Sequence, residues 1–179
     1  MIQHPGAPLK HPEFHGRIGV ARREITPPVG IYSRMWGSAT HDIATGVHRP
    51  LLGSCLVFQD LAGMTELILV ALDVMILWQE EAVRLREAIL SRMNLQPHQL
   101  IVHPSHSHST PMLARRHADR PGGHLIGPYV DSLPAVSCEL IAAARAACGE
   151  ATLGWTYGRC GMAFNRDFIE PGTGRDVCG

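Results

Sequence analysis

Hydrophobic positions in the first hundred residues follow two periods, one typical of strands and one typical of helices. Residues 52–58 and 66–74 are apolar runs separated by a turn-like segment, which predicts two strands. Residues 67–72 are apolar without alternation, which indicates a central strand covered on both faces. A helical period follows over residues 79–93, and residues 100–102 predict another buried strand. Strand, helix and strand in succession predict a βαβ unit with parallel strands.

The flanking segments are less regular. Residues 1–16 contain three prolines and predict an irregular lead-in, and the extended segment that follows ends at a pair of prolines. Abundant alanine predicts a second helix over residues 129–148, which Pro134 either kinks or starts. A strand is expected over residues 151–157. These elements together predict an α/β fold.

Composition narrows the class of protein. The 179 residues include 16 Lys and Arg against 16 Asp and Glu, and this balance argues against nucleic-acid binding, which needs a basic surplus. No apolar run reaches the roughly 18 residues of a membrane span, so we expect no transmembrane segment. The five cysteines are scattered, and the first residues do not resemble a secretion signal. We therefore expect a cytoplasmic protein in a reducing compartment.

Histidine is the one unusual residue type. There are 11 histidines, and six of them lie between residues 98 and 124. His106 and His108 follow the predicted strand at 100–102, and in open α/β sheets ligands bind at the carboxyl ends of strands. In an extended backbone residues i and i+2 point the same way, so both imidazoles are expected on one side. Neutral imidazole is the commonest metal ligand, although many loop histidines are simply solvated.

Asp73 is expected near these histidines because it ends the preceding strand of the same βαβ unit. Its carboxylate either binds a metal directly or accepts the second ring N–H of a ligand histidine. His98 is expected at the surface. His117 and His124 lie in a segment rich in glycine and arginine, which is either a flap over the site or plain surface.

Several common catalytic motifs are absent from the sequence. It contains no G-x-S-x-G elbow, no P-loop, no G-x-G-x-x-G after a strand and no H-E-x-x-H. Among enzymes, the pattern favours metal-assisted hydrolysis, in which the metal activates a water molecule and polarises a carbonyl group.

Six short motifs in a fixed order resemble landmarks of the N-terminal catalytic domain of the neutral/alkaline (non-lysosomal) ceramidase family. The resemblance runs from about residue 16 to the last residue, and it rests on the order of the motifs more than on any one of them. The motifs are residues 23–30, 35–37, 45–49, 69–73, 105–109 and 165–167.

This resemblance implies an α/β domain with a mixed sheet and a buried zinc that activates water to cleave the amide bond of N-acyl sphingosine. His106 matches the first zinc-ligand histidine, and His108 matches a histidine that faces the substrate. Arg166 matches an arginine that contacts the substrate or product, and Gly37 matches a glycine whose backbone lines the pocket. Asp73 is retained beside His108 as a catalytic candidate.

Some features leave alternatives open. Arg166 is also placed to pair with Asp167 or Asp176, and Gly37 is also a plausible turn glycine. The family's H-x-H motif usually continues into Gly-Pro-Gly-Gly, whereas here residues 110–113 are Thr-Pro-Met-Leu. This difference reshapes the loop over the pocket, so specificity for ceramide is open.

We therefore predict that residues 17–179 form the N-terminal part of a ceramidase-like catalytic domain, with a mixed, largely parallel central sheet flanked by helices. The predicted function is Zn²⁺-dependent hydrolysis of an amide bond in an N-acyl substrate, either a ceramide-like lipid or a smaller compound. The remaining metal ligands are expected beyond Gly179, and self-association into a homo-oligomer is left open. The alternative is a non-catalytic relative with a structural or interaction role. An amidohydrolase barrel is disfavoured because the H-x-H motif of such a barrel lies on its first strand, whereas here the motif follows a complete βαβ segment.

Overall fold

The computed structural model describes residues 13–35, 37, 39–162, 165 and 167–178. The chain divides into two compact units, of which the larger is Phe14–Thr152 and the smaller contains Leu153–Gly179 together with Met1–Glu13. In the smaller unit, strands β6 (Asp167–Ile169) and β7 (Asp176–Cys178) pair antiparallel. The predicted lead-in, 1–16, lies mostly outside the described residues, and the first strand begins within it at Phe14.

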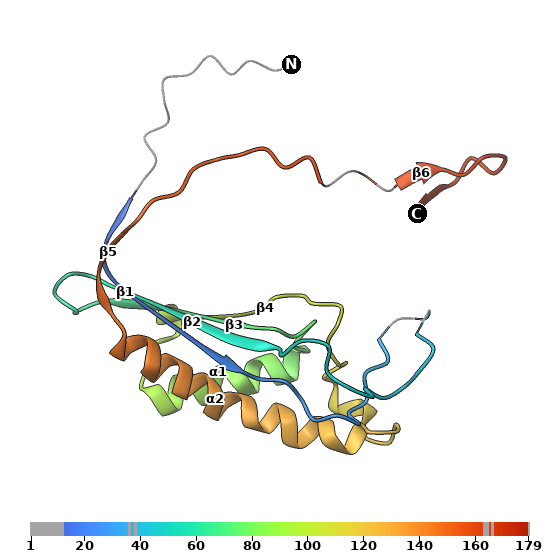
Figure 1. The fold of residues 1–179 in the computed structure, drawn as a ribbon, viewed down its shortest axis with the longest axis horizontal. Coiled ribbons are helices and arrows are strands. Elements are labelled where there is room, and N and C mark those ends of the chain that lie inside the picture. Colours follow the sequence, from blue (N-terminus) through green and yellow to red (C-terminus); the bar gives the residue numbers. More distant parts are fainter. Residues whose placement is uncertain (1–12, 36, 38, 163–164, 166, 179) are drawn as a thin grey trace, which may run out of the picture. The chain divides into compact units, whose positions relative to one another are not determined.

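The larger unit is built on a five-stranded sheet with the order β4-β3-β2-β1-β5 (Figure 1). The β1–β2 and β2–β3 ladders are antiparallel, whereas β3 and β4 pair parallel. The strands are β1 (Phe14–Glu24), β2 (Leu52–Gln59), β3 (Glu66–Leu72), β4 (Leu100–Pro104) and β5 (Gly149–Leu153).

The predicted mixed α/β fold is confirmed, and so is the parallel βαβ unit, which consists of β3, α1 and β4. Parallel pairing is less extensive than predicted because β2 and β3 are joined by a short turn rather than a crossover. Asp60 closes this turn, since its carboxylate accepts hydrogen bonds from the backbone N–H groups of Met64 (2.8 Å) and Thr65 (3.0 Å).

Two helices pack on the same face of this sheet (Figure 1). Helix α1 spans Gln79–Met93, the range predicted from its period, and α2 spans Ile126–Ala146, beginning three residues before the prediction and ending two residues earlier. Pro134 lies inside α2 and is buried, so it does not start that helix. Three short 3-10 helices connect these elements: η1 (Pro97–Gln99), η2 (Arg115–His117) and η3 (Gly123–Leu125). No helix in the described ranges is long and apolar enough to span a membrane.

The core lies between the sheet and the two helices. Alternate residues of β2 and β3 supply the sheet side, and their side chains are fully buried against apolar residues of both helices. Hydrophobic burial on this scale contributes most of the free energy of folding. The principal contributors are Cys55, Val57, Ile68, Val70, Leu72, Leu85, Ile89, Leu133 and Ile141.

Strand β3 is covered on one face within the larger unit, and the prediction that it is covered on both faces is wrong there. Val70 is 0% exposed, whereas Leu67, which points the other way, is 39% exposed. The reason is that α1 and α2 both pack on one face of the sheet. The apolar run at residues 67–72 therefore supplies side chains to a face that the helices cover and to a face that they do not cover. By strand alternation and register, the second face is apolar across four strands: Ile18, Val20, Leu56, Phe58, Leu67, Leu69 and Ile101.

Gly19 is where the sheet approaches α2 most closely. A Cβ atom at this position would lie 1.9 Å from the Ala144 carbonyl oxygen, a backbone atom that cannot move alone. We expect Gly19→Ala to lower the free energy of unfolding by about 2 kcal/mol or more. Gly149→Ala, where a Cβ meets nothing within 4 Å, is the matched control. Urea unfolding of the two variants tests this, and equal stabilities would contradict the packing described.

Cys55 couples the stability of the core to alkaline pH. Burial raises the pKa of its thiol from 9.0 to about 12. The unfolded thiol ionises first, so this stabilisation is fully present below pH 9 and is lost as the pH rises towards 12. We expect the free energy of unfolding to fall by up to about 1 kcal/mol per pH unit in this window.

Urea unfolding between about pH 8 and 11 measures this dependence. Replacement by alanine in Cys55→Ala removes this thiol and should make the profile less steep, while Tyr129, Cys138 and Cys148, whose pKa values burial also raises, keep part of the slope. The exposed Cys160 provides the control, because Cys160→Ala should keep the wild-type slope. A Cys55→Ala profile as steep as the wild type would show that other groups cause the alkaline loss.

Candidate active site at the ends of β3 and β4

The carboxyl ends of β3 and β4 lie side by side because these strands are parallel. Their pairing continues past the last strand residues. The Ser105 N–H donates to the Leu72 carbonyl (2.9 Å), and the His106 N–H donates to the Val74 carbonyl (3.1 Å). The main chain therefore fixes the start of the histidine segment against the segment that follows β3.

His106 is held in a defined ring orientation. Its Nδ1 lies 3.0 Å from the Met75 carbonyl oxygen, and because a carbonyl only accepts, Nδ1 carries the ring proton. Nε2 consequently has a lone pair for a metal or a proton. Histidines that bind metals commonly donate their second N–H to a backbone carbonyl in this way.

His108 lies next to His106, with ring centroids 5.1 Å apart and an angle of 70° between the ring planes. The two imidazoles are adjacent, but the extended backbone expected to place them so is wrong. His106 has a φ of 58°, in the left-handed region, and the chain turns directly afterwards. The Thr110 hydroxyl closes this turn by donating to the Ser107 carbonyl (3.0 Å).

Asp73 ties the end of β3 to the start of β2. Its carboxylate accepts the Leu52 N–H (2.9 Å), and its own N–H donates to the Leu52 carbonyl (2.9 Å). The ring N–H of His106 goes to Met75, so Asp73 does not orient that ring here. A catalytic role for Asp73 stays a prediction, while its structural role is visible.

The two candidates for substrate contact are Gly37 and Arg166, and only Gly37 is among the described residues. Gly37 is exposed in a turn, and a Cβ there would meet nothing within 4 Å. Arg166 lies outside the described residues, and so do both neighbours of Gly37 in the chain. The roles of Gly37 and Arg166 therefore stay predictions.

The segment around His117 packs against the long loop between β1 and β2. The His117 ring contacts Tyr32 edge-on, with centroids 5.3 Å apart, and burial followed by the charges of Arg116 and Arg120 lowers the pKa of this histidine. Gly122 passes so close to this loop that a Cβ would lie 2.0 Å from the Gly30 carbonyl oxygen. The segment is thus more firmly packed than a plain surface loop.

Two cavities of different polarity border the histidine segment. One, of about 290 Å³, has Ser107 and Ser109 on one wall and mainly apolar residues on the others, including Val29, Ile31 and Leu51. The other, of about 270 Å³, is polar and is lined by Ser33, His41, Thr45, His108 and Thr110, among others. They share four lining residues, Ala44, Gly46, Ser109 and Pro111, so they adjoin.

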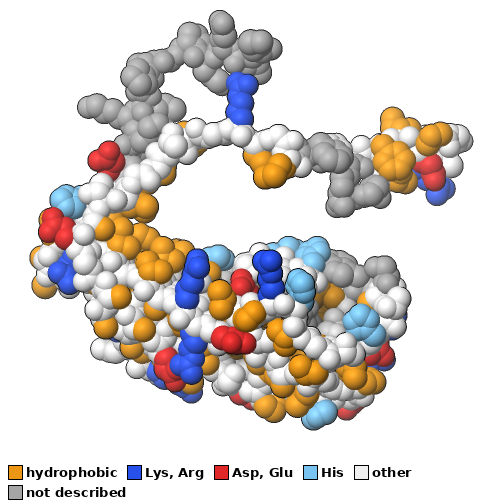
Figure 2. All heavy atoms as spheres, in the orientation of Figure 1, with side chains coloured by type: hydrophobic (Ala, Val, Ile, Leu, Met, Phe, Trp, Pro, Cys, Tyr) orange, Lys and Arg blue, Asp and Glu red, His pale blue; other side chains and the backbone are white. Residues whose placement is uncertain are grey.

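His41 is a member of the polar cavity that the sequence pattern did not single out. It lies 67 positions before His108 in the chain, in a loop without regular periodicity. The motifs at residues 35–37 and 45–49, on either side of it, were the nearest available signals. Figure 2 shows histidine side chains at several separate places on the visible face of the larger unit.

The described residues do not by themselves form a zinc site. Within them, no group of three or more His, Cys, Asp or Glu side chains is arranged to hold a metal ion. A catalytic zinc normally takes three protein ligands. The chemistry and orientation of His106 suit a single ligand position.

Comparison with solved structures identifies the class of fold. The chain is similar to the neutral ceramidase from Pseudomonas aeruginosa, with a TM-score of 0.54 and 17% identity, and to a ceramidase complexed with C2, with a TM-score of 0.58 and 16% identity. Each match covers 79% of this chain and 22% of the other chain, so this chain spans about a fifth of the length of those structures. No family model and no curated protein matches the sequence. The predicted resemblance to neutral ceramidases is confirmed at the level of fold.

The structural role of Asp73 can be separated from a chemical one. Asp73→Ala leaves the Leu52 N–H without its acceptor and should lower the free energy of unfolding by about 1–3 kcal/mol. Asp73→Asn keeps an acceptor oxygen and should lower the free energy of unfolding by less than half as much. Urea unfolding checks this order, and equal losses in both variants would contradict the hydrogen bond to Leu52.

Proposed function

We propose that this chain contributes part of the active site of a zinc-dependent hydrolase that cleaves the amide bond of an N-acyl substrate. The observation that carries the proposal is the ring tautomer of His106, with its proton on Nδ1. Its Nδ1–H donates to the Met75 carbonyl, which leaves a lone pair on Nε2, and the ring lies beside a second imidazole. The likeness in fold to ceramidases supports the choice of reaction class, and the residues at the ends of β3 and β4 have to carry the chemistry.

In this proposal His106 is a zinc ligand through Nε2. Zinc, when bound, supplies a polarised water molecule and a Lewis acid for the amide carbonyl. His108 lines the polar cavity next to His106 and donates or accepts a hydrogen bond at the substrate amide. Arg166 and the backbone of Gly37 are assigned to the polar end of the substrate, where a guanidinium and an N–H suit an oxygen-rich group.

The zinc site is completed by donors outside the described residues. Two adjacent imidazoles bind zinc weakly by themselves, and the described residues provide no third donor close to them. The proposal therefore requires further ligands, which are expected to include carboxylate, phenolate or imidazole groups. Asp73 keeps its structural bond to Leu52 in this arrangement.

The two adjoining cavities suggest how an N-acyl substrate is oriented. The apolar cavity bounded by Val29, Ile31 and Leu51 suits an acyl chain, whereas the polar cavity with His41 and His108 suits the amide and amine portion. The scissile bond would then lie near Ser109, which lines both cavities. The substrate is a ceramide-like lipid or a smaller N-acyl compound.

His106→Asn tests the proposal with little change to the backbone, since asparagine tolerates the left-handed conformation of this residue. We expect the full-length protein to bind about one zinc per chain, and the variant to lose zinc affinity and amidase activity by about 100-fold or more. The readouts are elemental analysis and a screen of short- and long-chain N-acyl substrates.

His103→Asn is the matched control. His103 is also exposed and also contacts a backbone carbonyl, that of Pro104 at 3.2 Å, but it precedes the histidine pair. This variant should keep both zinc and activity. Full activity in His106→Asn would refute the proposed ligand, and zinc binding without turnover on any N-acyl substrate would favour the non-catalytic alternative.

A further inference from the structure

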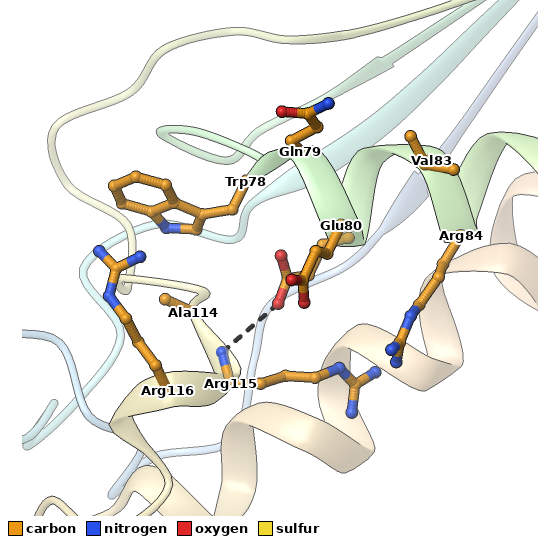
Figure 3. Close-up of a pocket in the computed structure, with 9 residues that line it drawn as sticks. Trp78, Gln79, Glu80, Val83, Arg84, Ala114, Arg115 and Arg116 are labelled. Carbon is orange, nitrogen blue, oxygen red and sulfur yellow. Dashed lines mark hydrogen bonds between the residues drawn. The ribbon is translucent and has the colours of Figure 1, made fainter.

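A separate cavity of about 680 Å³ lies between the first turn of α1 and the 3-10 helix η2 (Figure 3). Its walls include Trp78 and Arg84 on one side and Ala114, Arg115 and Arg116 on the other. None of its lining residues borders the two cavities beside the histidine pair. The function proposed above leaves this cavity unused.

Two buried hydrogen-bond donors of this cavity have no acceptor. The indole Nε1 of Trp78 and the guanidinium Nε of Arg115 are both buried and lack a hydrogen-bond partner within the described part of the chain. A buried donor without a partner costs about 1–3 kcal/mol, so such groups are rare unless something else satisfies them. In Figure 3 the indole nitrogen lies on the edge of Trp78 that faces Ala114 and Arg116.

The start of α1 adds further donors. Trp78 is the N-cap residue of α1, and its side chain makes no capping hydrogen bond. The Ala82 N–H bonds back to the Trp78 carbonyl, but the preceding N–H groups of the first turn have no acceptor within a regular helix. The positive end of the helix dipole points at the same place.

Charge around the cavity is close to balanced once Asp131, the partner of Arg115, is counted. Three arginines line it against two glutamates, Glu80 and Glu81. Glu81 is buried and accepts the Arg115 N–H at 3.4 Å, the dashed contact in Figure 3, while the Arg115 guanidinium pairs with Asp131. Arg116 is exposed, and its guanidinium lies over the face of the Trp78 ring, 4.0 Å from the centroid.

The Nε1–H of Trp78 and the Nε–H of Arg115 are donors without an acceptor in the described part of the chain. We propose that the cavity binds an oxyanion, the carboxylate or phosphate group of a small molecule, between Trp78 Nε1–H and the guanidinium of Arg116. Such a group accepts several hydrogen bonds at once and carries the charge that arginine and a helix start favour. The Arg116 side chain is long and exposed, so it can shift to admit an oxygen beside the indole.

The indole N–H of Trp78 reports binding directly. The ¹⁵N-labelled full chain, which has three tryptophans, is titrated with sodium phosphate or sodium acetate at fixed pH and at an ionic strength held constant with sodium chloride. Trp78→Phe assigns the Trp78 indole signal by its loss. We expect this signal to move and saturate with at least one of the two anions, while the signal of Trp155 stays in place. Saturation by only one anion identifies the group that the cavity takes.

Two variants and a control complete the test, with affinities measured by calorimetry. Arg116→Gln should weaken binding by about tenfold, because it removes a charge-assisted contact. Trp78→Phe keeps an aromatic ring under Arg116 but removes the donor, and should weaken binding by about fivefold. Arg92→Gln, on the last turn of α1 and outside the cavity, should change nothing. The proposal is overturned if neither anion saturates the Trp78 signal, or if Arg116→Gln binds as tightly as the wild type.

Discussion

The parallel pairing of β3 with β4 is the interaction on which the candidate active site depends. It continues beyond both strands through the bonds from Ser105 to Leu72 and from His106 to Val74. Backbone bonds of this kind fix the position of a loop more firmly than side-chain contacts do, because they add to a ladder that is already ordered. The Met75 carbonyl that orients His106 is itself part of the segment held in this way. The geometry of the histidine pair thus follows from the sheet.

The same sheet has two faces in different surroundings. One packs against α1 and α2, and the other presents apolar side chains such as Val20, Leu67 and Ile101 within the larger unit. An antiparallel sheet that faces water usually alternates apolar and polar residues, and here the alternation is missing. A contiguous apolar face of this kind is typical of surfaces that associate with other protein layers. This explains why residues 67–72 have the composition of a doubly covered strand although the two helices cover one side.

The two proposed binding regions offer opposite chemistry. The His106 ring keeps a lone pair on Nε2, which suits a cation, and the cavities beside the histidine segment divide into a polar and an apolar part. At the start of α1 the unused groups are N–H donors and guanidinium groups, which suit an anion. Residues 75–78 connect the two regions along the chain, since Met75 orients His106 and Trp78 begins the second cavity. The same short segment between β3 and α1 therefore orients His106 at one end and lines the second cavity at the other.

The sequence by itself determined the local elements and the chemistry of the histidine pair. The period over residues 79–93 located α1, the strand–helix–strand order determined the parallel β3–β4 pair, and that pairing placed Asp73 and His106 at one sheet edge. These features depend on side-chain periodicity and on the handedness of crossovers, which neighbouring residues in the chain specify. Tertiary structure alone decided the left-handed backbone of His106, the bond from its ring to Met75, the placing of both helices on one face, and the meeting of Trp78 with Arg116. Each of these requires contact between segments distant in sequence, and packing and backbone geometry in three dimensions settle such contacts.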